Sequence, residues 1–137
     1  NVASHHLIAV ASDGSSLATT GKLSVGKPHP RSYGTNPRFI QKFVNEKKVV
    51  TIQEAIRKMT SMPAQRLGLT NRGRLTPGYA ADIVIMDLPK VKEKATFADP
   101  HQYPEGISHV IVNGELVVEN EKYNGTKAGQ MITEFDS

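Results

Sequence analysis

The sequence predicts an α/β segment followed by a β segment within one chain of 137 residues. Three observations lead to this prediction. A short apolar run precedes a Ser-Asp-Gly tripeptide, apolar residues recur at helical spacing in the middle of the chain, and β-branched runs surround an Asn-Gly pair. We place the boundary near residue 69, so that residues 1–69 form the α/β segment and residues 70–137 the β segment.

The first expected element is a strand over Leu7–Ala11. It is short and apolar and ends at Ser12-Asp13-Gly14, as do strands of a parallel barrel that are covered on both faces. Residues 14–35 are rich in Gly, Ser, Thr and Pro and show no periodicity. We therefore expect a long loop there, of a length that is usually functional or disordered.

Helices are expected next. Asn36-Pro37 has the form of a capping residue followed by proline at the first helical position. Thr51-x-x-Glu54 is a capping box that should start a second helix. A third, shorter helix is expected over Pro63–Leu67, ending at Gly68.

The β segment has clear strand signals. Strands are expected over Ala81–Asp87, His109–Val112 and Glu115–Glu119. The Asn113-Gly114 pair predicts a tight hairpin, because both turn residues need positive φ. Residues 90–106 contain two prolines and read as an excursion between strands.

Composition narrows the functional classes. The net charge is +4, but the basic residues are scattered among acidic ones and do not alternate with aromatics, so no nucleic-acid partner is expected. There is no cysteine, which excludes disulfides and cysteine metal sites and fits a cytoplasmic location. The apolar runs are far shorter than a bilayer span, so no membrane partner is expected.

Several motifs resemble one family. They are Ser12-Asp13-Gly14, Pro28-His-Pro-Arg-Ser-Tyr-Gly-Thr-Asn-Pro-Arg38, the stretches 60–69 and 73–87, and Ala95-Thr-Phe-Ala-Asp-Pro-His-Gln-Tyr-Pro-Glu-Gly-Ile107. Together they resemble the C-terminal third of the D-aminoacylase, or N-acyl-D-amino-acid deacylase, branch of the amidohydrolase superfamily, over nearly the whole chain.

The resemblance implies an architecture. Residues 1–69 would be the end of a metal-dependent (β/α)8 amidohydrolase barrel, with its last strand, active-site loop and helices. Residues 70–137 would be strands of a small β-sandwich domain. A complete barrel needs about 250 residues, so we expect this chain to be a fragment whose main partner is the rest of the parent chain.

The resemblance also implies site residues. Asp13 would contact the metal and act as general base and then general acid, and Arg31 would bind the free carboxylate of a small N-acyl amino acid substrate. His29, held between two prolines, is a possible residue of the site loop, without a direct metal role. The cofactor would be zinc. Its remaining ligands, a His-x-His pair, further histidines and a cysteine, are missing here, so the isolated chain should be inactive.

The sequence departs from the family pattern at two places, and two other functions stay open. The loop between Gly14 and Pro28 looks longer than in the best-known D-aminoacylases, and Asn36 stands where an aromatic residue is more usual. One alternative is a cyclic amidase related to dihydroorotase or hydantoinase, whose substrates need no free carboxylate. The other is a non-catalytic scaffold or assembly module. A His-x-His motif upstream would favour an enzyme.

Overall fold

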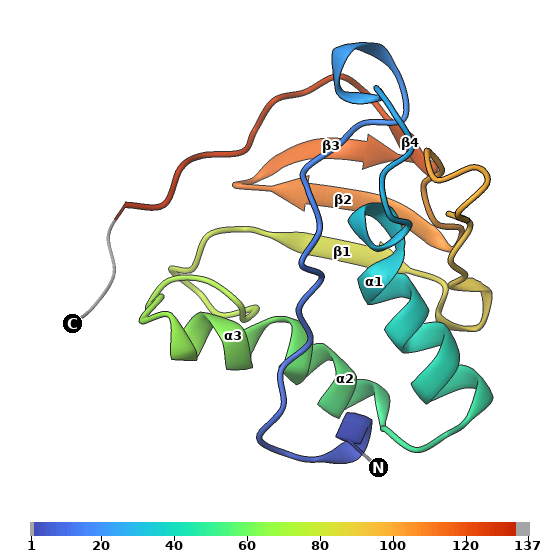
Figure 1. The fold of residues 1–137 in the computed structure, drawn as a ribbon. Helices are drawn as coiled ribbons and strands as arrows, with labels where there is room; N and C mark the ends of the chain where they lie inside the picture. The colour runs from blue at the N-terminus through green and yellow to red at the C-terminus, as the bar shows by residue number, and fades with distance from the viewer. Residues whose placement is uncertain (1, 134–137) are drawn as a thin grey trace.

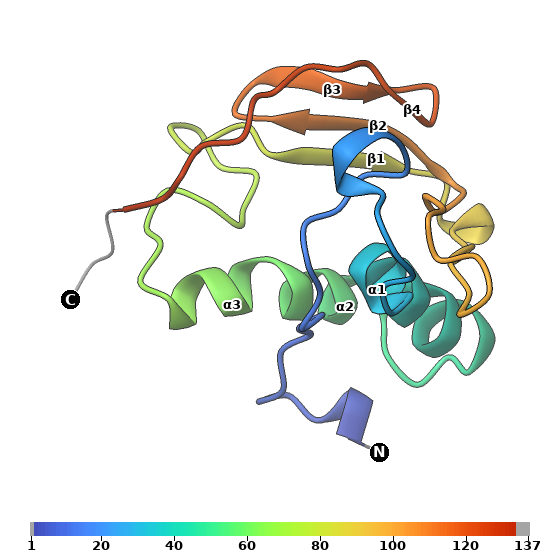
Figure 2. The same ribbon diagram turned by 45° about the horizontal axis from the view of Figure 1, so that its top comes forward.

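The computed structural model describes residues 2–133 and shows two layers, with the helices on one side and a sheet on the other (Figures 1 and 2). The helical elements are η1 (Val2–Ser4), η2 (Gly21–Leu23), α1 (Arg31–Phe39), the π-helix η3 (Ile40–Glu46), α2 (Ile52–Met59), α3 (Ser61–Arg66) and η4 (Leu88–Lys90). The strands are β1 (Ile83–Met86), β2 (Ile107–Val112), β3 (Glu115–Glu119) and β4 (Lys122–Tyr123). Among the described residues, no helix is long and apolar enough to cross a bilayer.

The sheet is antiparallel, with the strands side by side in chain order. The predicted hairpin between β2 and β3 is confirmed, with φ of 50° at Asn113 and 84° at Gly114. Its turn is held from outside: the Asn113 backbone N–H donates to Asp82 Oδ1 at 2.8 Å, and Arg72 Nη2 donates to Asn113 Oδ1 at 2.7 Å. Arg72 also pairs with Asp82 at 2.6 Å, so the hairpin is tied to the start of β1.

The short strand β4 was not predicted. It follows a turn in which Asn120 and Glu121 both have positive φ, 50° and 65°. Glutamate is not a residue that normally signals such a turn, and the strand has only two residues. Neither composition nor periodicity could therefore reveal it.

The predicted start of α2 is confirmed. The Thr51 side chain accepts a hydrogen bond from the backbone N–H of Glu54 at 3.3 Å, which satisfies one of the free donors of the first turn. The predicted third helix is also present, as α3. A small core joins these helices to the segment after η4, and its buried apolar residues include Ile40, Val50, Ala55, Val91 and Ala95.

The predicted start of α1 is wrong, because the helix begins at Arg31 and contains Pro37. The carbonyl of Pro30 already accepts from the backbone N–H groups of Tyr33 and Gly34, both at 3.0 Å. Pro30, with φ of −51°, presets the helical turn, so the signal at Asn36-Pro37 falls inside a helix that has already formed. The helix changes to π geometry at Ile40, three residues after that proline.

The predicted strand over Leu7–Ala11 is also wrong for this structure. Leu7 lies in a turn and is 69% exposed, and residues 8–11 belong to no sheet. The segment is held against α2 instead: Lys58 Nζ donates to the carbonyls of Ile8 and of the preceding His5, and the Val10 backbone N–H donates to the Lys58 carbonyl at 3.1 Å. A strand needs a neighbouring strand for its backbone hydrogen bonds, and the described residues provide none here.

Glu54 pairs with Lys58, which holds this segment, so the free energy of unfolding should depend on pH in the acid range. The pKa of Glu54 is lowered to about 2, first by the hydrogen bond from Arg57 and then by the charges of Arg57 and Lys58, against the opposing effect of desolvation. The unfolded value is about 4.3, so the stabilisation is present above about pH 4.3 and is lost as pH falls toward 2. The Tm should therefore fall less between pH 4.5 and 2 in Glu54→Gln than in the unmodified chain. Glu119→Gln, an exposed carboxylate on β3, is the control, and equal slopes in all three proteins would contradict this account.

Candidate functional site

The structure brings Asp13 and Arg31 together. Asp13 Oδ2 lies 3.2 Å from Arg31 Nη2, although a long loop separates the two residues in the chain. Both side chains are accessible, with 88% of Asp13 and 45% of Arg31 exposed. Asp13 has φ of 49°, a left-handed conformation that Asp tolerates better than most residues.

Gly14 allows this approach. A Cβ atom at Gly14 would lie 2.9 Å from the Cα atom of Ser32, in the first turn of α1, closer than real Cβ contacts come. The loop is also tied to that turn by Ser15, whose backbone N–H donates to Ser32 Oγ at 3.3 Å. The Ser-Asp-Gly motif therefore places Asp13 at the start of α1, because its glycine has no side chain.

His29 serves the start of the helix. Its Nδ1 accepts a hydrogen bond from the backbone N–H of Arg31 at 3.0 Å, and its ring meets Phe97 edge to face at a centroid distance of 4.9 Å. The imidazole thus fixes the backbone from which the Arg31 side chain extends. The structure shows no contact between His29 and Asp13 within the described residues.

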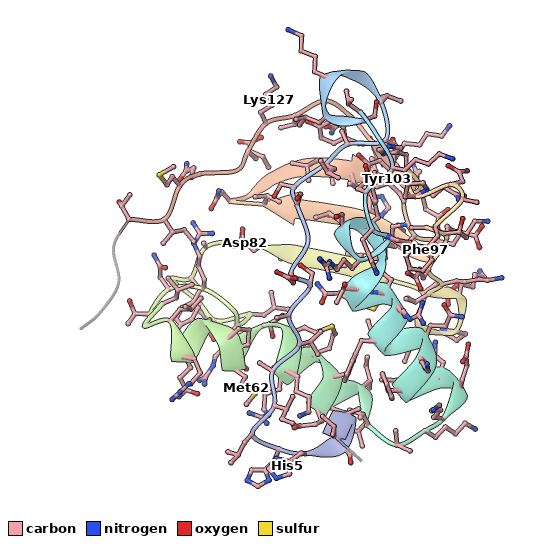
Figure 3. The ribbon with its side chains drawn as sticks, viewed as in Figure 1. His5, Met62, Asp82, Phe97, Tyr103 and Lys127 are labelled. Carbon is pink, nitrogen blue, oxygen red and sulfur yellow. The ribbon has the colours of Figure 1, made fainter. Side chains whose placement is uncertain are left out.

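Further along, α1 also packs against the residues after η4. Arg38 Nη1 donates to Glu93 Oε2 at 3.0 Å, and a Cβ atom at Gly34 would lie 2.5 Å from Glu93 Oε1. Figure 3 shows Phe97 and Tyr103 on this same side of the molecule, beside α1. Two motifs that are far apart in the sequence, Pro28–Arg38 and Ala95–Ile107, therefore meet in space.

Sequence reasoning missed two residues at this junction, Tyr33 and His101, whose side chains form a hydrogen bond of 2.7 Å. His101 lies outside residues 1–69, the segment expected to hold the site residues. The only available signal was that each residue belongs to one of the two motifs.

Asp13 can offer one oxygen ligand to a metal ion, since its carboxylate is largely exposed even while it pairs with Arg31. In the part of the chain that the structure covers, no three His, Cys, Asp or Glu side chains come together as a metal site would require. The neighbouring residues His5 and His6 stack on each other at 4.9 Å, and Figure 3 shows His5 beside η1, at the edge of the molecule.

Comparison with known proteins finds a matching family model, similar sequences and similar structures. A family model described as the amidohydrolase family matches residues 17–118. N-acyl-D-aspartate deacylase of Alcaligenes xylosoxydans xylosoxydans is 37% identical over 134 residues, 98% of this chain and 26% of that protein. The zinc- and phosphonate-bound structure of N-acyl-D-glutamate deacylase from Bordetella bronchiseptica is 35% identical, with a TM-score of 0.72 over 83% of this chain and 23% of that one. A D-aminoacylase variant in complex with copper chloride is 37% identical, with a TM-score of 0.75 over 79% of this chain and 23% of that one.

The extent of these matches differs between classes of protein. Dihydroorotases of Lactobacillus species match shorter stretches, between 38% and 63% of this chain. The deacylases match most of it, whereas the chain spans about a quarter of the length of the deacylases.

Proposed function

This chain belongs to the amidohydrolase family, and we propose that it forms the C-terminal part of a metal-dependent enzyme that removes the acyl group from N-acyl-D-amino acids. The observation that carries the proposal is the 3.2 Å contact between Asp13 and Arg31. The reaction needs a carboxylate for proton transfer and a cation for the substrate's carboxylate, and these two residues lie together at the start of α1.

Asp13 is the proposed general base and acid. Its exposed carboxylate takes a proton from the attacking water and returns that proton to the departing amine. Zinc, when bound, supplies the Lewis acidity that makes a water molecule lose its proton near neutral pH. Asp13 would be one of its ligands, and a single ligand does not hold zinc, so we propose that this chain is inactive without the remaining family segments.

Arg31 is the proposed carboxylate-binding residue. A guanidinium is planar and can donate two parallel hydrogen bonds to a carboxylate, which positions the substrate as well as attracting it. The His29 ring and the first turn of α1 fix its backbone, while nearly half of the side chain stays open. These features support a role in orienting the α-carboxylate of the substrate.

We also propose that residues 1–69 are the end of a (β/α)8 barrel and residues 70–137 part of a small β domain. The extended segment Leu7–Ala11 supports this assignment. It is mostly exposed and has no strand beside it among residues 2–133, and neighbouring barrel strands would supply the ladder hydrogen bonds that a strand makes.

Arg31→Lys tests the substrate assignment in the complete enzyme, meaning this chain together with the remaining family segments. Lysine keeps the charge but loses the planar fork. We expect kcat/KM for an N-acyl-D-amino acid to fall about 10- to 100-fold, the loss of a charge-assisted hydrogen bond of about 1.5–3 kcal/mol. An analogue with an amidated α-carboxylate should lose much less.

Arg38→Lys is the matched control, because Arg38 lies on the same helix and pairs with Glu93 away from Asp13. It should leave kcat/KM unchanged for both substrates. Equal losses for the two substrates in Arg31→Lys would remove Arg31 from carboxylate binding. Turnover of cyclic amides in preference to N-acyl-D-amino acids would instead favour the cyclic amidase alternative, which the shorter dihydroorotase matches disfavour.

A further inference from the structure

Two side-chain contacts connect the loop of residues 14–28 to other parts of the molecule, and a third joins the two side chains that make them. The Tyr33 hydroxyl, on α1, lies 2.7 Å from the carbonyl oxygen of Ala18 and 2.7 Å from His101 Nδ1. The other ring nitrogen, His101 Nε2, lies 2.9 Å from the carbonyl oxygen of Gly26. The loop is thus held at two points, by residues that are 15 and 75 positions away in the sequence.

The protons available to these contacts can be counted. The carbonyls of Ala18 and Gly26 can only accept, so Tyr33 must donate to the first and His101 Nε2 to the second. Burial, and to a lesser extent the charge of Tyr103, raises the pKa of Tyr33, so its hydroxyl keeps its single proton throughout the neutral range. The remaining contact, between the Tyr33 oxygen and His101 Nδ1, then needs a proton on Nδ1.

A neutral imidazole cannot satisfy all three contacts. With its proton on Nε2 it donates to Gly26, and its Nδ1 must accept the one proton of the Tyr33 hydroxyl, which leaves the Ala18 carbonyl without a donor. With protons on both nitrogens, His101 donates to Gly26 and to Tyr33, and Tyr33 donates to Ala18. Only this state forms all three hydrogen bonds.

The surroundings of His101 supply little other charge. Tyr33 meets its ring edge to face at 5.6 Å, and Tyr103 lies against Tyr33 at 6.2 Å. Lys27, next to Gly26, and Asp99, on the segment of His101, are exposed. Within residues 2–133 no ion pair joins His101 to a carboxylate, so its two hydrogen-bond acceptors are its main polar partners.

We propose that Tyr33 and His101 are positioning residues of the candidate site, and that uptake of a second proton by His101 completes the hydrogen bonds that hold the loop of residues 14–28. The loop joins Asp13 to Arg31, so its order sets how closely those side chains are held. The link to catalysis rests on the proposed function. The dependence of the loop's hydrogen bonds on the protonation of His101 does not.

Hydrogen exchange of this chain tests the proposal. The reporters are the backbone amides of Ala18 and Ser24, which bond to loop carbonyls. After correction for the intrinsic effect of pH on exchange, their protection should be about fivefold greater at pH 5.5 than at pH 8, the effect of about one hydrogen bond across the range in which histidine titrates. In Tyr33→Phe and His101→Gln this ratio should fall to near one.

Tyr103→Phe is the matched control, since it removes a hydroxyl from the same ring cluster and should keep the fivefold ratio. A ratio near one in the unmodified chain would overturn the proposal, and so would a fivefold ratio that persists in Tyr33→Phe and His101→Gln. If those variants fail to fold, ¹⁵N NMR of the His101 ring in the unmodified chain decides the matter: both nitrogens should carry protons at pH 5.5, and a singly protonated ring would overturn it. No hydrolysis is read in either measurement, so failure here leaves the Arg31→Lys result standing, and the reverse also holds.

Discussion

Replacing Asp13 with Asn is expected to lower kcat of the complete enzyme by about 10²- to 10⁴-fold, the usual contribution of general acid–base catalysis. Asparagine has the same shape but cannot take a proton from water. The substitution should leave the fold intact, because the side chain is 88% exposed and Asn tolerates the positive φ of 49° at this position. Steady-state kinetics with an N-acyl-D-amino acid measures the effect.

Metal content must be measured in the same samples, because a neutral side chain is also a weaker ligand. A variant with full metal and little turnover would show that Asp13 carries the proton. Asp87→Asn is the matched control: it removes an exposed carboxylate that pairs with Lys90 at 2.7 Å, outside the site. Its turnover should be unchanged, and normal turnover in Asp13→Asn would contradict the assignment of this residue.

Replacing Gly106 with Ala is expected to cost about 4 kcal/mol of unfolding free energy. The residue has φ of 80°, and a Cβ atom there would lie 2.6 Å from backbone atoms of both Lys90 and Val91. Positive φ costs about 1–3 kcal/mol in a residue with a side chain. Overpacking adds about 1–3 kcal/mol, because the backbone atoms it meets cannot rotate away. Urea unfolding followed by circular dichroism measures the change.

Gly114→Ala separates the two contributions. Gly114 has a similar φ of 84°, but a Cβ atom there would meet nothing within 4 Å. Gly114→Ala should therefore lose about 1–2 kcal/mol of unfolding free energy, from backbone strain alone. If the two variants lost the same stability, the close approach of Gly106 to the segment after η4 would not be the reason for its glycine.

The parts of the fold that the sequence predicted have local causes. Asn113-Gly114 makes its turn because two adjacent residues accept positive φ, and Thr51 caps α2 by bonding a backbone N–H three residues away. Such interactions are contained in a few consecutive letters. The same is true of the strands on either side of the turn, whose β-branched residues favour a half-buried pleated surface.

What the sequence could not provide depends on partners that are distant in the chain. Leu7–Ala11 has the composition of a strand, but a strand forms only where another strand lies beside it. Asp13 and Arg31 could each be selected from motifs, whereas their contact depends on the missing side chain of Gly14. The pairing of Tyr33 with His101 spans 68 positions, and no local pattern contains it.

The exposed extended segment also affects how this chain behaves at high concentration. Leu7–Ala11 combines apolar residues with no charge and no proline. None of its backbone groups pairs with a described strand, although the N–H groups of Leu7, Ile8 and Val10 have other acceptors. These are the properties of segments that pair with copies of themselves and begin self-association. The net charge of +4 opposes this by mutual repulsion, and the repulsion weakens as the pH approaches the isoelectric point near 9.4 or as salt screens it. We therefore expect surface charge to limit self-association of the chain, because no strand within residues 2–133 covers this segment.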